Sequence, residues 1–169
     1  MKDSILLSII IVNYRTPDLT ARCIESIYAT TRCSFEIIVV DNASEDDSKE
    51  RICTAFPKVI WIQNKANEGF GRANNLGVLH ANGKYILLLN SDMVVLGNTI
   101  DYCLEQIKND DTIAAYTCKL QNPDGTYQNN LCVDYVDFRK SLNSNILFVK
   151  LFGESHSDSS IKGIMGAFM

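Results

Sequence analysis

The stretch that decides the fold is Tyr-Ile-Leu-Leu-Leu-Asn-Ser-Asp, residues 85–92. Its first five residues are mostly apolar, which is typical of a strand buried on both faces of a parallel sheet. The polar residues that follow require the strand to end, so Asp92 is expected at the carboxyl edge, where open α/β sheets bind ligands. Asp92 then has two interpretations: it holds a divalent metal against a phosphorylated ligand, or it caps a helix at the start of an ordinary loop.

Similar apolar runs alternate with amphipathic segments along most of the chain. Strands are predicted at 6–12, 35–40, 59–62, 85–89 and 112–118. Helices are predicted at 17–30, from the N-cap Ser44 to Pro57, from about residue 70 to Asn82-Gly83, and after Gly97-Asn98. The alternation predicts an α/β fold with a doubly wound, mostly parallel sheet flanked by helices.

The pattern weakens after residue 127. We therefore divide the chain into an α/β ligand-binding domain at 1–127 and an irregular segment at 128–169. Within that segment, 138–152 is predicted to form one or two short helices, and 153–160 has the composition of a loop. The apolar end at 166–169 has no cap or polar tail, so we expect the sequence to be part of a longer protein.

Composition narrows the class of protein. The chain has 169 residues, 46% of them apolar, and a net charge of −4 with no basic tract, so nucleic acid is not an expected partner. The six cysteines show no metal-site spacing, which favours a reducing, cytoplasmic setting. No run of eighteen apolar residues is present, so we expect no membrane span, while peripheral membrane association stays open.

Several common site motifs are absent from the sequence. The first strand is followed by Asn13-Tyr14 rather than by the glycines of a dinucleotide site or the acidic pair of a receiver domain. No phosphate-binding Gly-x-x-x-x-Gly-Lys loop and no Gly-x-Ser-x-Gly nucleophile elbow occur. The two histidines, His80 and His156, are expected to be structural or solvated.

Polar residues instead follow three of the predicted strands. They are Asn13-Tyr14, Asp41-Asn42 and residues 90–92. In a doubly wound sheet these three ends open on the same edge, next to the loop rich in Asn and Gly at 64–71. The convergence predicts a pocket for a polar ligand.

Five segments together resemble the family 2 glycosyltransferases, which are inverting enzymes of the GT-A fold. They are SIIIVNY (8–14), EIIVVDNAS (36–44), NEGFGRANNLG (67–77), LLNSD (88–92) and GAFM (166–169). Their order and spacing are most similar to the rhamnosyltransferase-like branch. The resemblance implies a Rossmann-like domain that binds a nucleotide sugar over residues 1–127, and the start of the acceptor side in 128–169.

The resemblance also implies an activity. Such an enzyme transfers a sugar from a nucleoside-diphosphate sugar, here suggested to be dTDP-rhamnose, to a glycan or lipid-linked acceptor with inversion. Surface polysaccharide synthesis, in the cytoplasm or at the inner face of the membrane, is the implied setting. The alternative is a non-catalytic nucleotide- or sugar-binding module of the same fold.

The family's nucleotide-sugar site maps onto eleven positions of this chain: Val12, Asn13, Tyr14, Asp41, Asn67, Phe70, Gly71, Asn74, Asn90, Ser91 and Asp92. Asp41 would accept a hydrogen bond from the ring N–H of the base, because a carboxylate accepts but does not donate. Asp92 would bind Mg²⁺ or Mn²⁺ that bridges the donor phosphates. Gly77 is expected to allow close packing rather than ligand contact.

The chain departs from the family pattern at three points. Asn90 replaces the first carboxylate of the Asp-x-Asp motif, and Asn74 stands where many relatives carry Arg. The catalytic base, which must take the acceptor proton, is expected beyond Met169. Asp134 and Asp137 are not favoured for that role.

Overall fold

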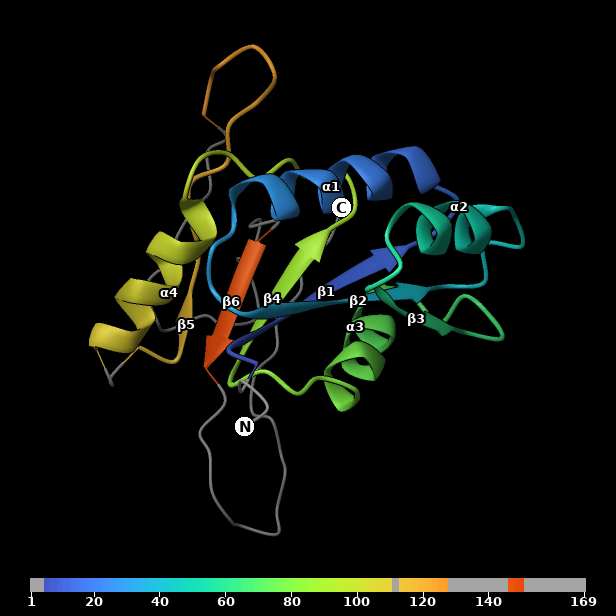
Figure 1. The fold of residues 1–169 in the computed structure, drawn as a ribbon, viewed down its shortest axis with the longest axis horizontal. Helices are drawn as coiled ribbons and strands as arrows, with labels where there is room; N and C mark the ends of the chain where they lie inside the picture. Colours follow the sequence, from blue (N-terminus) through green and yellow to red (C-terminus); the bar gives the residue numbers. More distant parts are fainter. Residues whose placement is uncertain (1–4, 111–112, 128–145, 151–169) are drawn as a thin grey trace, which may run out of the picture.

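The computed structural model describes residues 5–110, 113–127 and 146–150, the last as backbone only. The sheet has the strand order β3-β2-β1-β4-β6-β5 (Figure 1). Its strands are β1 (Leu7–Asn13), β2 (Phe35–Asp41), β3 (Ile60–Gln63), β4 (Tyr85–Asn90), β5 (Ala115–Tyr116) and β6 (Ile146–Lys150). The helices are α1 (Pro17–Thr30), α2 (Ser48–Ala55), α3 (Phe70–Leu79) and α4 (Thr99–Asn109).

The four strands nearest the N-terminus form a parallel sheet, as predicted. β1 lies at its centre and pairs in parallel with β2 and with β4, and β2 pairs in parallel with β3. Each of these strands is followed by a helix that returns the chain to the same end of the sheet. The carboxyl ends of all four strands therefore lie along one edge.

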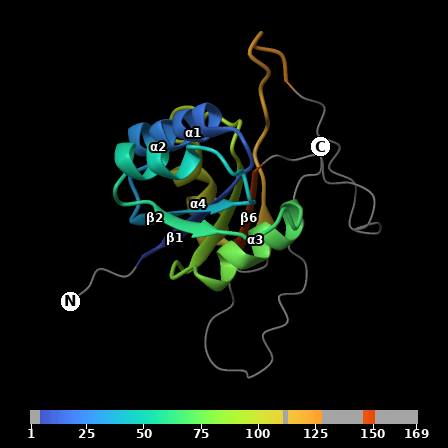
Figure 2. The same cartoon turned by 90° about the vertical axis from the view of Figure 1, so that its right-hand side faces the viewer.

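Both faces of the sheet are covered at β1, β2 and β4, which explains why these three strands are almost continuously apolar. Figure 2 shows α1 and α2 on one face and α3 on the other. Alternate residues of β1 and β4 pack against α1, α2 and α4, and the residues between them pack against α3. The core thus consists of two apolar layers divided by the sheet.

The prediction of helices over 138–152 is wrong at 146–150, which form the strand β6. β6 pairs antiparallel with β4 on one side and with β5 on the other. It covers the edge of β4, whose backbone groups would otherwise lack strand partners. Of the predicted fifth strand at 112–118, the described residues 113–118 contain the two-residue strand β5, which pairs antiparallel with β6.

The boundary at residue 127 stays a prediction, although the sheet takes β6 from beyond it. The rest of 128–145 and all of 151–169, including Asp134, Asp137 and His156, lie outside the described residues. His80 is exposed at the C-terminus of α3, where its Nδ1 lies 2.9 Å from the Leu76 carbonyl oxygen. Within the described part of the chain, no helix combines the length and the apolar character that a membrane crossing requires.

Gly77 allows α3 to pack directly on the sheet, as expected. A Cβ atom at this position would lie 2.5 Å from Cγ2 of Ile10 and 3.2 Å from Cγ2 of Val40. Gly71, six residues earlier on α3, would carry a Cβ with no atom within 4 Å. The two glycines of the same helix thus differ in their surroundings.

We predict that Gly77→Ala lowers the free energy of unfolding by about 1 to 2 kcal/mol, because overpacking outweighs the gain in helix propensity. The matched control, Gly71→Ala, should leave stability unchanged or slightly raised. Urea denaturation followed by circular dichroism measures both variants. Equal stability of the two variants would contradict the close packing of α3 on β1.

Candidate functional site

The register of the parallel strands brings four polar side chains to one edge. Asn13 of β1 lies opposite Asp41 of β2, and Asp41 lies opposite Gln63 of β3. On the other side of β1, Asn90 of β4 lies opposite Val12. Because paired residues of parallel strands point to the same face, Asn13, Asp41 and Gln63 form a continuous polar row.

The centre of this row is the carboxylate of Asp41, which is only 2% exposed. Its Oδ1 accepts hydrogen bonds from Nδ2 of Asn13 at 2.7 Å and from the hydroxyl of Ser44. Its Oδ2 accepts from the backbone N–H of Ser44 at 2.9 Å and from Nε2 of Gln63 at 2.6 Å. All four acceptor positions of the carboxylate are therefore used within the protein.

These hydrogen bonds determine the ionisation of Asp41. Burial alone would raise its pKa, but the bonds from Ser44, Gln63 and Asn13 outweigh burial and hold the pKa below its usual value. Asp41 is therefore a buried anion that neutral donors stabilise.

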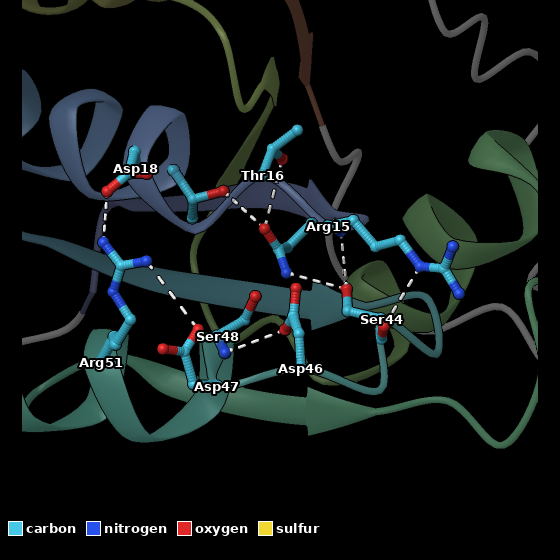
Figure 3. Close-up of polar contacts among 10 residues, drawn as sticks. Arg15, Thr16, Asp18, Ser44, Asp46, Asp47, Ser48 and Arg51 are labelled. Carbon is cyan, nitrogen blue, oxygen red and sulfur yellow. Dashed lines mark hydrogen bonds and ion pairs between the residues drawn. The ribbon is translucent and has the colours of Figure 1, made fainter.

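Ser44 links Asp41 to the loop between β1 and α1. Besides donating to Asp41, its hydroxyl accepts from Nδ2 of Asn13 at 3.1 Å and from the backbone N–H of Arg15 at 2.9 Å. Its carbonyl oxygen accepts from Nε of Arg15 at 3.3 Å, as Figure 3 shows. One serine thus joins the two loops that follow β1 and β2.

The prediction that Ser44 caps the second helix is wrong. α2 begins at Ser48 with Asp47 in the N-cap position, and the backbone N–H of Ser48 donates to Oδ1 of Asp46 at 2.9 Å (Figure 3). Ser44 does not serve as the cap because its hydroxyl is already bonded to Asn13, Asp41 and the backbone N–H of Arg15. The three residues between Ser44 and Ser48 form part of the site loop instead.

The backbone of these loops is strained. Arg15, Ala43 and Glu45 have φ angles of 57°, 64° and 54°, in the left-handed region that costs about 1 to 3 kcal/mol for each non-glycine residue. Within the described residues, no other non-glycine residue has a positive φ. Strain confined to one edge of the sheet, and held by the bonds of Ser44, indicates that this edge is shaped for a ligand.

Asn42 organises the loop that precedes α3. Its Nδ2 donates to Oδ1 of Asn67 at 2.6 Å, while its Oδ1 accepts from Nδ2 of Asn64 at 3.0 Å and from the backbone N–H of Glu68 at 3.1 Å. Asn67 in turn accepts from the backbone N–H of Gly69 at 3.0 Å. The Asn- and Gly-rich loop is thus tied to the end of β2.

The predicted residues of α3 lie in its first turns, at the end of the helix nearest the site edge. Phe70 is half-buried and Gly71 is exposed. Asn74 is buried, and its Nδ2 donates to the carbonyl oxygen of Phe70 at 3.0 Å, within its own helix. Its amide is thus bonded within α3 in this structure.

Asp92 lies exposed just beyond β4. The hydroxyl of its neighbour Ser91 is 3.3 Å from that of Thr16, which links the ends of β4 and β1. On the other side, the Cys23 thiol donates to the Asn90 carbonyl oxygen at 3.6 Å, and burial, with the charge of Asp92, raises the pKa of Cys23 to about 12. Cys23 therefore stays a thiol and supplies no nucleophile.

The residues around Asp92 fit a divalent cation only in part. Asp92 supplies one carboxylate, and Ser91 and Asn90 supply neutral side-chain oxygens. Across the described part of the chain, no group of three His, Cys, Asp or Glu residues is placed to hold a metal. A hard cation here fits if ligand phosphates provide most of the remaining oxygens, as they do for many Mg²⁺ sites.

The three predicted residues of the first strand end lie in different surroundings. Val12 packs in the core layer under α3, and the side chain of Asn13 is fully buried, so Asn13 positions Asp41 instead of facing solvent. Tyr14 is exposed, with the Arg15 guanidinium 5.2 Å from the centre of its ring. Tyr14 is therefore the residue of this strand end whose side chain is open to a ligand.

Three residues of the site are absent from the eleven positions that the family resemblance implies. They are Asn42, which is predicted only as part of the polar end of the second strand, Ser44, which is predicted as a helix cap, and Gln63. Asn42 and Ser44 lie within three residues of Asp41 in the sequence, and this proximity could have indicated that they belong to the site. Gln63 gave no signal beyond its place at the end of the third strand.

The matches to known proteins agree with this geometry. The model of the family described as "Glycosyl transferase family 2" matches residues 8–163. The chain belongs to this family. A family relative, "Glycosyltransferase GlyG" of Streptococcus pneumoniae, is 30% identical over 151 residues, which are 82% of this chain and 49% of GlyG. The chain thus spans about half the length of this curated relative.

Solved structures confirm the GT-A type fold expected for family 2. The mannosyltransferase PcManGT of Pyrobaculum calidifontis, in complex with GDP-Man and Mn²⁺, has a TM-score of 0.66 at 19% identity, covering 85% of this chain and 44% of that protein. S. aureus TarS 1-349 in complex with UDP-GlcNAc has a TM-score of 0.69 at 19% identity, covering 86% and 45%.

We predict that Asp41→Asn destabilises the protein by roughly 2 to 3 kcal/mol at pH 7, because its amide group would face donors. The pKa of Asp41 is lower in the folded than in the unfolded state, so its stabilisation is complete above the ordinary value of about 3.9 and is lost as pH falls through the folded value. The difference from wild type should therefore shrink below about pH 4. Urea denaturation between pH 3 and 7 measures it.

The surface substitution Glu50→Gln on α2 serves as the control and should change stability little at any pH. A wild-type advantage over Asp41→Asn that stays constant down to pH 3 would contradict the assignment of Asp41 as a hydrogen-bonded anion.

Proposed function

We propose that this chain is the donor-binding part of a glycosyltransferase that takes a sugar from a nucleoside-diphosphate sugar. The observation that carries the proposal is the alignment of three polar strand ends at one edge, with the buried anion Asp41 at β2 and the exposed carboxylate Asp92 beyond β4. Family membership supports the same activity.

The ends of these strands fit one extended ligand. Gln63, Asp41, Asn13 and Asn90 end four adjacent strands, so the four strand ends span three strand spacings, or about 14 Å. This length is comparable with that of an extended nucleoside diphosphate. The base would lie over β2 and β3, and the diphosphate would reach the residues after β4.

A divalent cation, Mg²⁺ or Mn²⁺, would be held at Asp92, with Asn90 and Ser91 close to it. When bound, such a cation neutralises the diphosphate and helps it leave as the bond to the sugar breaks. The Mn²⁺ and GDP-Man in PcManGT and the UDP-GlcNAc in TarS support a ligand of this class. Asn90 would contribute a hydrogen bond to the ribose or the sugar.

The chain's own residues would position this ligand. The bonds of Asn42 to Asn67 and to the backbone of Glu68 hold the loop before α3 beside the site. The N-terminus of α3, which carries Gly71, favours an anion. Tyr14 offers an exposed aromatic ring at the end of β1. The bond between Thr16 and Ser91 fixes the loop after β4 against the start of α1.

We further propose inversion at the anomeric carbon, a glycan or lipid-linked acceptor, dTDP-rhamnose as the donor, and a role in surface polysaccharide synthesis on the cytoplasmic side of the membrane. These proposals rest on the five sequence segments and on family membership. Incubation of the full-length protein with nucleotide sugars and acceptor, followed by NMR of the product anomer, tests them. Binding without any transfer would favour the non-catalytic module.

We predict that the chain binds nucleoside diphosphates in the presence of Mn²⁺ and that Asp92→Ala weakens this binding at least about tenfold, because the cation loses its protein carboxylate. Isothermal titration calorimetry with UDP, GDP and dTDP, with Mn²⁺ and with EDTA, measures the effect.

Asp124→Ala, which removes an exposed carboxylate from the turn at 122–125, is the matched control and should bind as wild type does. An Asp92→Ala titration that equals the wild-type titration in Mn²⁺ would remove Asp92 from the metal site.

A further inference from the structure

The starting point is a conflict at Asp41. In the proposed function Asp41 accepts a hydrogen bond from the base, yet its four acceptor positions are filled by Asn13, Ser44 and Gln63. A base can therefore bond to this carboxylate only after one protein donor has left.

Three of the four donors cannot leave without disturbing the fold. The amide of Asn13 is fully buried and also bonded to Ser44 and Thr20. Ser44 is 3% exposed, and it donates both through its backbone N–H and through a hydroxyl that holds the strained loop at Arg15. Their bonds to Asp41 are part of the scaffold.

Gln63 differs from these donors. It is exposed, it is the last residue of the edge strand β3, and its amide reaches Oδ2 of Asp41 from outside the core at 2.6 Å. Its Oε1 accepts from Nε1 of Trp61 at 3.1 Å, a bond that lies at the surface. A change of rotamer would release Oδ2 of Asp41 without moving the backbone, and it would also break the bond from Nε2 to the Asn64 carbonyl oxygen, at 3.3 Å.

A cavity lies against this position. Its volume is about 280 Å³, close to the lower limit of about 300 Å³ for ligand pockets, and Asp41, Trp61, Gln63 and Lys65 contribute to its walls. Ser48 lines the same cavity, and its hydroxyl is buried with no hydrogen-bond partner in the described part of the chain. The cavity is thus lined by an aromatic side chain, and a buried hydroxyl without a hydrogen-bond partner belongs to one of its wall residues.

The chemistry of Gln63 resembles that of a base edge. Its amide places an N–H on Asp41 next to a carbonyl group, which is the arrangement of the ring N–H and adjacent C=O of uracil, thymine and guanine. Cytosine and adenine present an acceptor at the corresponding ring nitrogen. We propose that Gln63 is an internal competitor that occupies the base position on Asp41 and is displaced by nucleotides whose base carries a ring N–H.

This inference rests on the proposed function and adds a residue that controls affinity and base selectivity at the same site. A competitor lowers the apparent affinity by the fraction of molecules in which it occupies the site. Removing the Gln63 amide therefore strengthens binding, whereas removing a residue that only contacts the ligand would weaken it.

The test is calorimetric titration of wild type and Gln63→Ala with UDP, dTDP, GDP, CDP and ADP in Mg²⁺. We expect Gln63→Ala to bind UDP, dTDP and GDP at least about fivefold more tightly than wild type does, with no gain for CDP or ADP. The control Gln121→Ala, at an exposed glutamine of the turn after β5, should behave as wild type. Thermal unfolding of each variant verifies that it is folded.

A second measurement follows the amide itself. In wild type, the side-chain NH₂ resonances of Gln63 should shift on addition of UDP and Mg²⁺ and stay in place with CDP. Unchanged resonances with UDP bound would show that Gln63 keeps its place on Asp41 and would overturn the inference.

The outcomes separate the two proposals. If wild type binds nucleotides but Gln63→Ala binds them equally or more weakly, Gln63 is no competitor and the proposed function stands. If the gain is equal for CDP and ADP, the competition for the ring N–H is refuted. If neither protein binds any nucleotide, the proposed function fails and the inference fails with it.

Discussion

The ionised, buried carboxylate of Asp41 is the constraint on which the site depends. Removing a carboxylate from water costs several kcal/mol unless hydrogen bonds or a cation compensate it. Among the described residues no lysine or arginine forms a salt bridge with Asp41, so neutral donors from β1, β3 and the loop after β2 must all reach it. This requirement fixes the relative positions of three segments and stabilises the left-handed residues Arg15, Ala43 and Glu45.

The sheet supplies the positions that these donors need. Because both faces of β1 are buried, a shift of one residue would move its apolar side chains between two differently shaped core layers. The register is therefore well specified, and it places Asn13, Asp41 and Gln63 side by side at the strand ends. Core packing far below the edge thus determines the geometry of the polar row, and Gly77 contributes by letting α3 approach β1.

Sequence reasoning succeeded where one local pattern determines one element. The apolar runs of β1, β2 and β4 and the Pro17 start of α1 were predicted within a residue of their observed bounds. Sequence reasoning failed where contacts with residues far away in the sequence determine the local structure. Ser44 has the properties of an N-cap, but the tertiary bonds to Asp41, Asn13 and Arg15 take its hydroxyl. β6 enters the sheet from a segment of weak periodicity, and Gln63 is an ordinary exposed glutamine until its register opposite Asp41 is known.

The two carboxylates of the site differ in burial, and they are therefore suited to different groups of the ligand. Asp92 is exposed, so in the proposed function it can exchange water for a hydrated cation with little further loss of solvation. Asp41 is 2% exposed and already compensated by donors, so a cation would gain little there, whereas a directional N–H can replace one donor with another. The diphosphate would therefore favour Asp92 beyond β4, and the base would favour Asp41 at the end of β2. The same burial that restricts Asp41 to hydrogen-bond donors explains why the amide of Gln63 is bonded to it in this structure.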